Sequence, residues 1–271
     1  MIPSKFDYVV AESVEHAIEQ LGQDSEAKLL AGGHSLIPLM KTRLARPSKL
    51  IDVGRLGLSG VTDSGDHLVV GALTRHADLE HDATAKHHCP ILAHTAGQVG
   101  DRQVRHRGTI GGSCAHGDPA SDLPTICLLL DATFVAQGPG GTRQIAATDF
   151  FRGFLETALA ADEILTAIHV PKTGGAGWSY IKFRQRALDW ATVGVAAVVN
   201  GGARIAFTNM GPTTLRASAA EAAYASGGAA AAAAAAPDGT DPPSDTWASA
   251  DFRRHLVQVL TGRALAEAGG K

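Results

Sequence analysis

Two short glycine-rich segments carry the residue types that hold phosphate groups. The first, Gly32-Gly33-His34-Ser35, follows an apolar run at residues 28–31, and the second is Thr109-Ile110-Gly111-Gly112-Ser113. Glycine accepts positive φ and lets the backbone approach a ligand without a Cβ in between. Successive N–H groups in such a turn form a concave anion site, and a helix N-terminus adds to the field. Two such turns, neither with a lysine of its own, suit the two phosphates of a pyrophosphate.

Neither turn matches a common nucleotide-binding fingerprint. The Gly-Lys-Ser/Thr ending of Walker A and the Rossmann pattern G-x-G-x-x-G are absent from both turns. This argues against a nucleoside triphosphatase and against a dehydrogenase built around NAD. Each turn alone is also compatible with a simple tight connection, because Gly-Gly turns are common. Ser35 has two possible roles, as a donor to a phosphate oxygen or as the cap of a helix that begins near Leu36.

Composition bounds the class of protein. The 271 residues carry a formal net charge of −3, with 45% hydrophobic and 19% charged residues. This balance is ordinary for a globular protein, and the absence of a basic field argues against nucleic acid as a partner. No apolar stretch reaches the roughly 18 residues of a membrane span, and the N-terminus lacks the apolar core of a signal peptide.

The cysteines point to a reducing compartment. Cys89, Cys114 and Cys127 are an odd number and form no C-x-x-C pair. That spacing argues against a disulfide framework, a zinc site and an iron–sulfur cluster held by this chain. We therefore expect a cytoplasmic protein with reduced thiols.

The first two thirds of the chain alternate short strands and helices around the two turns. Ser13 has the position of an N-cap before a helix that Gly22 ends. We expect strands at residues 28–31, 49–53, 67–71 and 164–170, a hairpin at 133–136 and 142–145, and a helix at 91–103. The best internal linker is Gly174-Gly175-Ala176-Gly177, so we place a boundary near residue 173.

The last third predicts an antiparallel sheet followed by a terminal helix. Residues 178–183, 193–199 and 204–207 have the alternation of such a sheet. Ser249 has the position of an N-cap, and the helix after it would turn Phe252, Leu256, Leu260 and Ala264 inward. The alanine-rich stretch at 227–245 could be a helix or a mobile loop, and composition does not decide between them.

Both turns lie in longer motifs that resemble one family. AGGHSLIPLMKTRLARPSKLIDV, residues 31–53, and GTIGGSCAHGDPASDLP, residues 108–124, resemble the two flavin loops of the FAD-binding medium subunit of the molybdenum hydroxylases, the carbon monoxide dehydrogenase and xanthine dehydrogenase family. FFRGFLETALAADEIL, which ends at Leu165, and KFRQRALDWATVGVAA, residues 182–197, resemble further blocks of that family. The similarity covers nearly the whole chain.

The resemblance implies an α+β chain with a PCMH-type, vanillyl-alcohol-oxidase-like FAD-binding fold. Two α+β lobes, at about residues 1–55 and 56–173, would form the FAD-binding domain at 1–173. Residues 174–271 would form a C-terminal domain of antiparallel sheet and helices.

The resemblance also implies where FAD would lie. Its diphosphate would bind at the two glycine turns, its ribityl or adenosine part near Asp122, and its isoalloxazine near Asp189 and Trp190. The cofactor-binding residues that we expect are Ala31, Gly32, Gly33, His34, Ser35, Leu36, Thr109, Ile110, Gly111, Gly112, Ser113, Asp122, Lys182, Asp189 and Trp190. We expect no catalytic acid or base and no metal ligand in this chain.

Two side chains near the turns have more than one interpretation. His34 could be a covalent flavin anchor or a general base, and we favour the simpler role of shaping the loop through a local hydrogen bond. Asp118 and Asp122, four residues apart, could be metal ligands, but Pro119 and Pro124 favour a turn into a helix that Ser121 or Asp122 caps.

The function implied is electron transfer. The chain would pass electrons from the [2Fe–2S] clusters of a small subunit through FAD to an external acceptor, while a large subunit carries the molybdenum cofactor. The complex would be a dimer of heterotrimers in the cytoplasm, possibly at the inner face of the membrane, acting on carbon monoxide, an aldehyde or an N-heterocycle. The alternatives are a self-sufficient FAD oxidoreductase of the same fold and a non-redox sensor of a phosphate ligand.

Overall fold

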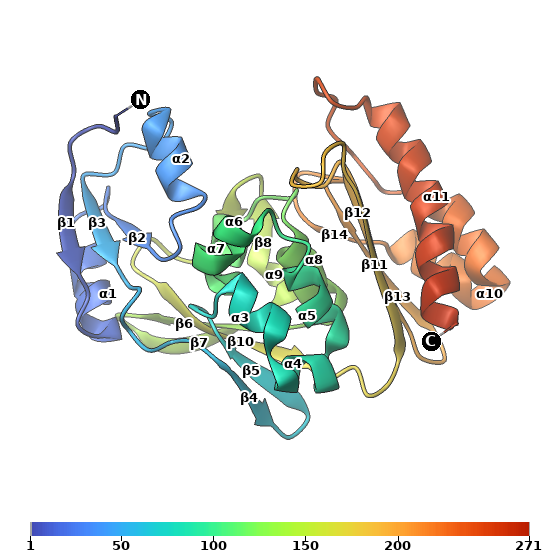
Figure 1. Cartoon of the computed structure of the whole chain (residues 1–271), viewed down its shortest axis with the longest axis horizontal. Coiled ribbons are helices and arrows are strands. Elements are labelled where there is room, and N and C mark those ends of the chain that lie inside the picture. The colour runs from blue at the N-terminus through green and yellow to red at the C-terminus, as the bar shows by residue number, and fades with distance from the viewer. Residues whose placement is uncertain (1, 271) are drawn as a thin grey trace.

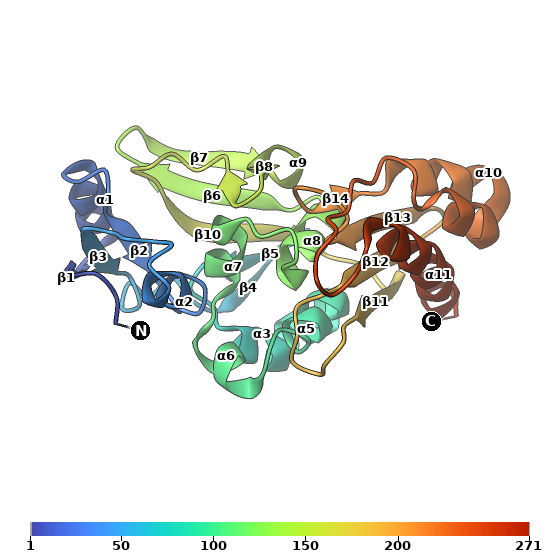
Figure 2. The same cartoon turned by 90° about the horizontal axis from the view of Figure 1, so that it is seen from above.

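The computed structural model describes residues 2–270 and places three lobes in chain order along one axis (Figures 1 and 2). The N-terminal lobe holds a parallel sheet in the order β1-β3-β2, with bounds β1 (Asp7–Val10), β2 (Lys28–Leu30) and β3 (Lys49–Asp52). Helix α1 (Val14–Gly22) packs on this sheet through Ala17, Ile18 and Leu21, and helix α2 (Leu36–Lys41) follows the first glycine turn. As predicted, Ser13 caps α1, because its hydroxyl accepts the His16 N–H at 3.1 Å.

The middle lobe is a five-stranded antiparallel sheet covered by helices. Its order is β4-β5-β10-β6-β7, with bounds β4 (Val61–Ser64), β5 (His67–Gly71), β6 (Thr133–Gly138), β7 (Gly141–Ala146) and β10 (Ile164–Pro171). The helices are α3 (His76–His81), α4 (Ala83–His88), α5 (Pro90–Ala96), α6 (Arg102–Arg107), α7 (Ile110–His116), α8 (Asp122–Leu129) and α9 (Ala147–Phe150), and a small ribbon joins β8 (Phe151–Gly153) to β9 (Glu156–Thr157). The hairpin and the strands predicted here are confirmed.

The single helix predicted at residues 91–103 is wrong. Helix α5 ends at Ala96, and a separate helix, α6, begins at Arg102. The turn between them contains Gly100 at φ +49° and ends at Asp101, whose carboxylate accepts the Val104 N–H at 2.8 Å and caps α6. A glycine in the left-handed region followed by an N-cap starts a new helix instead of continuing the old one.

The C-terminal lobe is an antiparallel sheet in the order β11-β12-β13-β14, in which the first three strands were predicted and the short β14 was not. The strands are β11 (Gly177–Phe183), β12 (Val193–Val199), β13 (Ala203–Thr208) and β14 (Leu215–Arg216). Helices α10 (Ser218–Ala235) and α11 (Ala250–Gly269) cover one face, and helices α5 and α8 of the middle lobe approach the other. Successive residues of β12 alternate between the two cores, since Ala196 and Val198 pack toward the middle lobe and Val195 and Ala197 toward α10 and α11.

Two details of this lobe complete the sequence interpretation. The alanine-rich stretch is helical up to Ala235, with a kink at Gly228, whose φ is +69°. Ser249 caps α11 as predicted, and Leu256, Leu260 and Ala264 are buried. Phe252, predicted to face inward, is 44% exposed and meets Phe183 edge to face, so that prediction is wrong. Within residues 2–270, no helix has both the length and the apolar character needed to cross a membrane.

Candidate cofactor-binding site

The first glycine turn is a loop with free backbone donors. It connects the end of β2 to the start of α2, and Gly33 sits at φ +77°, as a turn of this kind requires. In the described chain, the N–H groups of Gly32, Gly33, His34 and Ser35 have no hydrogen-bond acceptor. Ser35 occupies the N-cap position of α2, but its hydroxyl makes no capping bond. The loop therefore presents four amides and a hydroxyl that an anion could use.

The second glycine turn has a different construction. Its amides are already bonded within the fold, from Ile110 to the Thr74 carbonyl at 3.0 Å and from Gly111 to the Ala72 carbonyl at 2.8 Å. The Gly112 N–H donates to the Thr109 hydroxyl at 3.2 Å, which makes Thr109 the N-cap of α7. The prediction that this turn is a second cluster of free amides is wrong, because Thr109 and the end of β5 satisfy them.

The two turns nevertheless lie against each other. A Cβ built on Gly32 would lie 2.3 Å from the Arg107 carbonyl oxygen and 2.7 Å from the Cα of Gly108. A Cβ on Gly112 would lie 3.9 Å from the Cβ of Ala31. Both separations require that the loops pack backbone to backbone, so Gly32 is needed for their close approach.

A cavity of about 560 Å³ opens where the turns meet. Residues of both turns line it, and so do Asp122, shortly after the second turn, and three predicted residues of the last third of the chain. The predicted site residues on its wall are Ala31, Gly32, Gly33, His34, Ser35, Leu36, Thr109, Gly111, Gly112, Ser113, Asp122, Lys182, Asp189 and Trp190. Ile110 is the exception, because its side chain is fully buried in the core of the middle lobe.

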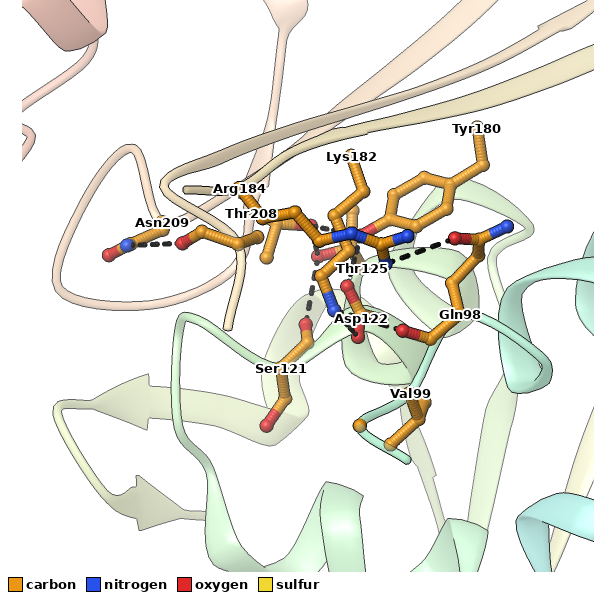
Figure 3. A network of polar contacts seen from close by, with 12 residues as sticks. Gln98, Val99, Ser121, Asp122, Thr125, Tyr180, Lys182, Arg184, Thr208 and Asn209 are labelled. Atoms are coloured by element: carbon orange, nitrogen blue, oxygen red, sulfur yellow. Dashed lines mark hydrogen bonds and ion pairs between the residues drawn. The ribbon is translucent and has the colours of Figure 1, made fainter. Parts of the chain in front are cut away.

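A buried ion pair forms one wall of the cavity and joins two lobes. Lys182 on β11 donates to Asp122 at the start of α8, with Nζ and Oδ2 2.7 Å apart, and also to the Gln98 carbonyl at 3.1 Å. The Tyr180 hydroxyl donates to the other Asp122 oxygen at 2.5 Å. Figure 3 shows Lys182 and Tyr180 reaching from the C-terminal sheet toward Asp122. A charge pair so well shielded from water fixes the C-terminal sheet against helix α8 of the middle lobe.

Burial governs the protonation of this group. It raises the pKa of Asp122, although the neighbouring Lys182 ammonium opposes the shift. Burial and the Asp122 carboxylate together raise the pKa of Tyr180 well above its ordinary value. Tyr180 therefore stays a hydrogen-bond donor at any physiological pH.

The segment that carries Asp189 and Trp190 forms the opposite edge of the cavity. The Asp189 carboxylate accepts from both the backbone N–H and the Nε of Arg186, each at 3.1 Å. Trp190 is 56% exposed, so the fold does not use its ring for core packing. An exposed indole on the rim of a cavity is available to a ligand or to a partner.

His76 is a wall residue that the sequence interpretation missed. It begins α3, is buried, and its Nδ1 has no partner among the described residues. Burial, with help from Arg105 and His34, lowers its pKa to about 4, so the imidazole is neutral at physiological pH. No motif in the sequence marks His76, since its state depends on burial and on charges that only the fold brings near it.

The segment after β8 was also missed as a part of the wall. Thr157, residues 159–161 and residues 163–165 face the cavity. The motif FFRGFLETALAADEIL contains all of them, so the resemblance of that block to a family block was the signal that could have found them.

The structure also shows the surroundings of His34 and Asp118, the two remaining candidate residues. His34 is exposed and makes no hydrogen bond within the described chain, so the local bond expected of it is absent. Asp118 accepts the Ala120 N–H at 2.8 Å in a tight turn, whereas Asp122 is held by Lys182. Residues 2–270 contain no cluster of three histidine, cysteine or acidic side chains with the spacing to hold a metal ion.

Two family models together match almost the whole chain. The first, the FAD binding domain in molybdopterin dehydrogenase, matches residues 4–173, and the second, the CO dehydrogenase flavoprotein C-terminal domain, matches residues 178–268.

Curated relatives and solved structures agree with these models. The chain is 40% identical to the carbon monoxide dehydrogenase medium chain of Hydrogenophaga pseudoflava, over 98% of this chain and 97% of the relative. It is 38% identical to the 6-hydroxypseudooxynicotine dehydrogenase complex subunit alpha of Paenarthrobacter nicotinovorans, over 99% and 96%. A solved structure of carbon monoxide dehydrogenase from Hydrogenophaga pseudoflava superposes with a TM-score of 0.96 at 43% identity, covering 100% of this chain and 99% of that one.

Proposed function

The chain belongs to the FAD-binding medium subunits of the molybdenum hydroxylases, and on that premise we propose that its FAD binds in the cavity between the two glycine turns. The chain is an oxidoreductase subunit, and FAD is the cofactor that carries electrons through it. Its fold is the α+β fold of carbon monoxide dehydrogenase medium subunits. The proposal concerns which residues hold the cofactor and how.

The observation that carries the proposal is the free donor set of the first turn. Four unpaired amides at residues 32–35 and the Ser35 hydroxyl face a cavity that the second turn closes from the other side. Amides in a glycine turn and at a helix N-terminus have no acceptor within the helix, and a diphosphate would supply one. The second turn would contribute the Ser113 hydroxyl and a surface without Cβ atoms at Gly111 and Gly112.

The other walls would position the remainder of the cofactor. FAD supplies the redox chemistry, and the protein supplies binding, orientation and electrostatics. Lys182, held by Asp122, would place one positive charge against the cofactor, and Trp190 would cover one of its edges. Neutral His76 would exclude water from the inner wall. We assign no acid–base catalyst to the chain.

The partners follow from the family. The relatives are medium subunits of multi-subunit molybdenum hydroxylases, which implies a small and a large partner subunit. We propose that the small subunit carries [2Fe–2S] clusters, that the large one carries the molybdenum cofactor, and that the complex is a dimer of heterotrimers in the cytoplasm. We also propose a domain boundary at residue 173, which is supported by the end of one family model at 173 and the start of the next at 178.

The substrate of the complex belongs to the partner subunits. Relatives of nearly equal identity, 40% and 38%, are named for carbon monoxide and for 6-hydroxypseudooxynicotine, so similarity of the medium subunit does not select a substrate. We propose carbon monoxide, an aldehyde or an N-heterocycle as the substrate class.

Purification of the complex through a tag on this chain tests the proposal. We expect FAD, iron and molybdenum to copurify in a fixed ratio and the complex to reduce a dye acceptor with one substrate of a panel of carbon monoxide, aldehydes and N-heterocycles. The chain alone should bind FAD and show no turnover with that panel. A lone chain that oxidises a panel substrate with its own FAD would instead support a self-sufficient oxidoreductase.

A further inference from the structure

A second cavity, of about 770 Å³, lies beside the first, and the two share only Asp189 and Trp190 among their lining residues. These two residues therefore form a partition between the cavities. They lie in the connection from β11 to β12, which leaves the sheet after Phe183 and returns at Thr192, whose N–H donates to the Phe183 carbonyl at 2.9 Å. Within this connection the Arg186–Asp189 ion pair is largely exposed and contributes little rigidity.

Arg253 holds the base of the partition from the side of the second cavity. It lies on α11 and is only 1% exposed. Its guanidinium donates to the Thr192 carbonyl, and its Nη2 lies 2.6 Å from an Asp245 oxygen. A guanidinium this deeply buried loses its hydration, and its Nε has no partner among the described residues. The Asp245 carboxylate offsets part of this loss, and the Thr192 carbonyl, two residues after Trp190, takes a second donor of the guanidinium.

Asn209 holds the same segment from a different element. It follows β13 in the left-handed region, at φ +62° (Figure 3). Its side-chain amide donates to the carbonyls of Ala191 at 2.8 Å and Thr192 at 3.4 Å. Its backbone N–H donates to the Pro119 carbonyl of the middle lobe at 2.8 Å. Asn209 thus ties the partition to the C-terminal sheet and to the FAD-binding domain at once.

We propose that Arg253 and Asn209 are positioning residues that hold the Asp189–Trp190 partition in place from outside the flavin cavity. Neither side chain lines that cavity. They act through the carbonyls of Ala191 and Thr192, which fix the direction of the chain just after Trp190. We call the hydrogen bonds from Arg253 and Asn209 to these two carbonyls the clamp. The part of this inference that concerns FAD rests on the proposed function, whereas the clamp is a property of the chain alone.

The clamp is tested first without cofactor. In a variant with Trp178→Phe and Trp247→Phe, Trp190 is the only tryptophan, since the chain has three. Arg253→Met and Asn209→Gly should each raise the acrylamide quenching constant of Trp190 and lower its steady-state anisotropy. Glycine at 209 keeps the left-handed backbone and removes only the amide, so it separates the hydrogen bonds from the backbone conformation. Arg254→Met is the matched control, because Arg254 is the adjacent residue and its one ion pair within residues 2–270 is with exposed Asp251 on its own helix.

The second measurement uses the FAD-loaded chain. Both variants should change the visible circular dichroism of the bound flavin and weaken FAD binding by about tenfold, while Arg254→Met changes neither. If Arg253→Met does not fold, Asn209→Gly decides. Trp190 quenching and flavin dichroism that match the Arg254→Met control would overturn the clamp. A wild-type chain that binds no FAD would instead overturn the proposed function, and the cofactor-free measurement would still judge the clamp.

Discussion

Gly33 is the residue of the first turn at which a side chain would be least tolerated. At φ +77° a side chain is strained, and a Cβ would lie 2.7 Å from the Cδ1 of Ile37. Gly33→Val should therefore displace the free amides and weaken FAD binding by about tenfold, since the strain is of the order of 1–2 kcal/mol. Isothermal titration of the cofactor-free chain with FAD measures this change.

Gly65→Val is the matched control for that prediction. Gly65 has a similar φ of +82° in the turn between β4 and β5, and no heavy atom lies within 4 Å of its Cβ position. The control should lose fold stability and keep FAD affinity. Equal FAD affinity in the Gly33 and Gly65 variants would contradict the role of the first turn.

The buried imidazole of His76 predicts acid sensitivity. Its folded pKa is lowered to about 4 from an ordinary 6.5, so between these values the unfolded chain binds a proton that the folded chain does not. The stability that depends on neutral His76 is complete above pH 6.5 and is lost as the pH falls toward 4, at up to about 1.4 kcal/mol per pH unit and about 3 kcal/mol in total. Urea unfolding of wild type and His76→Gln across this range should show a shallower slope in the variant. An unchanged slope, or the same change in the exposed-residue control His81→Gln, would contradict this account.

The sequence predicted the backbone conformation of the first turn, but it did not predict which amides of the second turn find acceptors elsewhere in the fold. The positive φ expected of the glycine turns is present at Gly33 and absent at Gly112. The two turns look alike in sequence, but in the second the amides of Ile110 and Gly111 donate to carbonyls more than thirty residues earlier, and Thr109 accepts from the other two. Only the folded chain reveals that difference.

At the scale of elements, the buried Asp122–Lys182 ion pair connects α8 to β11. Lys182→Met would leave a carboxylate buried beside Tyr180, which costs roughly 3–5 kcal/mol of unfolding free energy near neutral pH. The loss should shrink as the pH falls, because burial raises the pKa of Asp122 and a neutral carboxyl needs no counterion. Denaturant titration at pH 7.5 and 5 measures both effects.

Lys172→Met provides the comparison for this pair. Lys172 pairs with Asp63 at 2.6 Å, but the carboxylate is 42% exposed. Its loss should destabilise the chain far less than the loss of Lys182, because solvent screens an exposed pair. Similar decreases in the free energy of unfolding for Lys172→Met and Lys182→Met would show that the buried pair does not hold α8 and β11 together.

Elements were predicted well where a cap or an alternating pattern defines them. Ser13 and Ser249 cap helices as expected, and the sheet of the C-terminal lobe has the predicted strands. The break between α5 and α6 was missed because Gly100 and Asp101 lie within an otherwise continuous helical pattern. Phe252 was misplaced because its periodicity fits the buried face of α11, whereas at the start of this helix it meets only the end of β11, where Phe183 leaves it 44% exposed.

At the scale of the whole molecule, the cavity in which we propose that FAD binds is lined by residues of all three lobes. The N-terminal lobe supplies the free amides, the middle lobe supplies α7, α8 and His76, and the C-terminal lobe supplies Lys182 and Trp190. We therefore expect a chain truncated after residue 173 to bind FAD far more weakly than the full chain, even where circular dichroism shows retained structure. Undiminished affinity in the truncated chain would contradict a contribution from the C-terminal lobe.

The central claim is that FAD lies with its diphosphate between the two glycine turns. A crystal structure of the FAD-loaded chain tests it most directly. The account predicts phosphate oxygens within hydrogen-bond distance of the amides at residues 32–35, with Lys182 and Trp190 beside the rest of the cofactor. Amides 32–35 without a phosphate neighbour, and FAD lodged in another cleft, would contradict it.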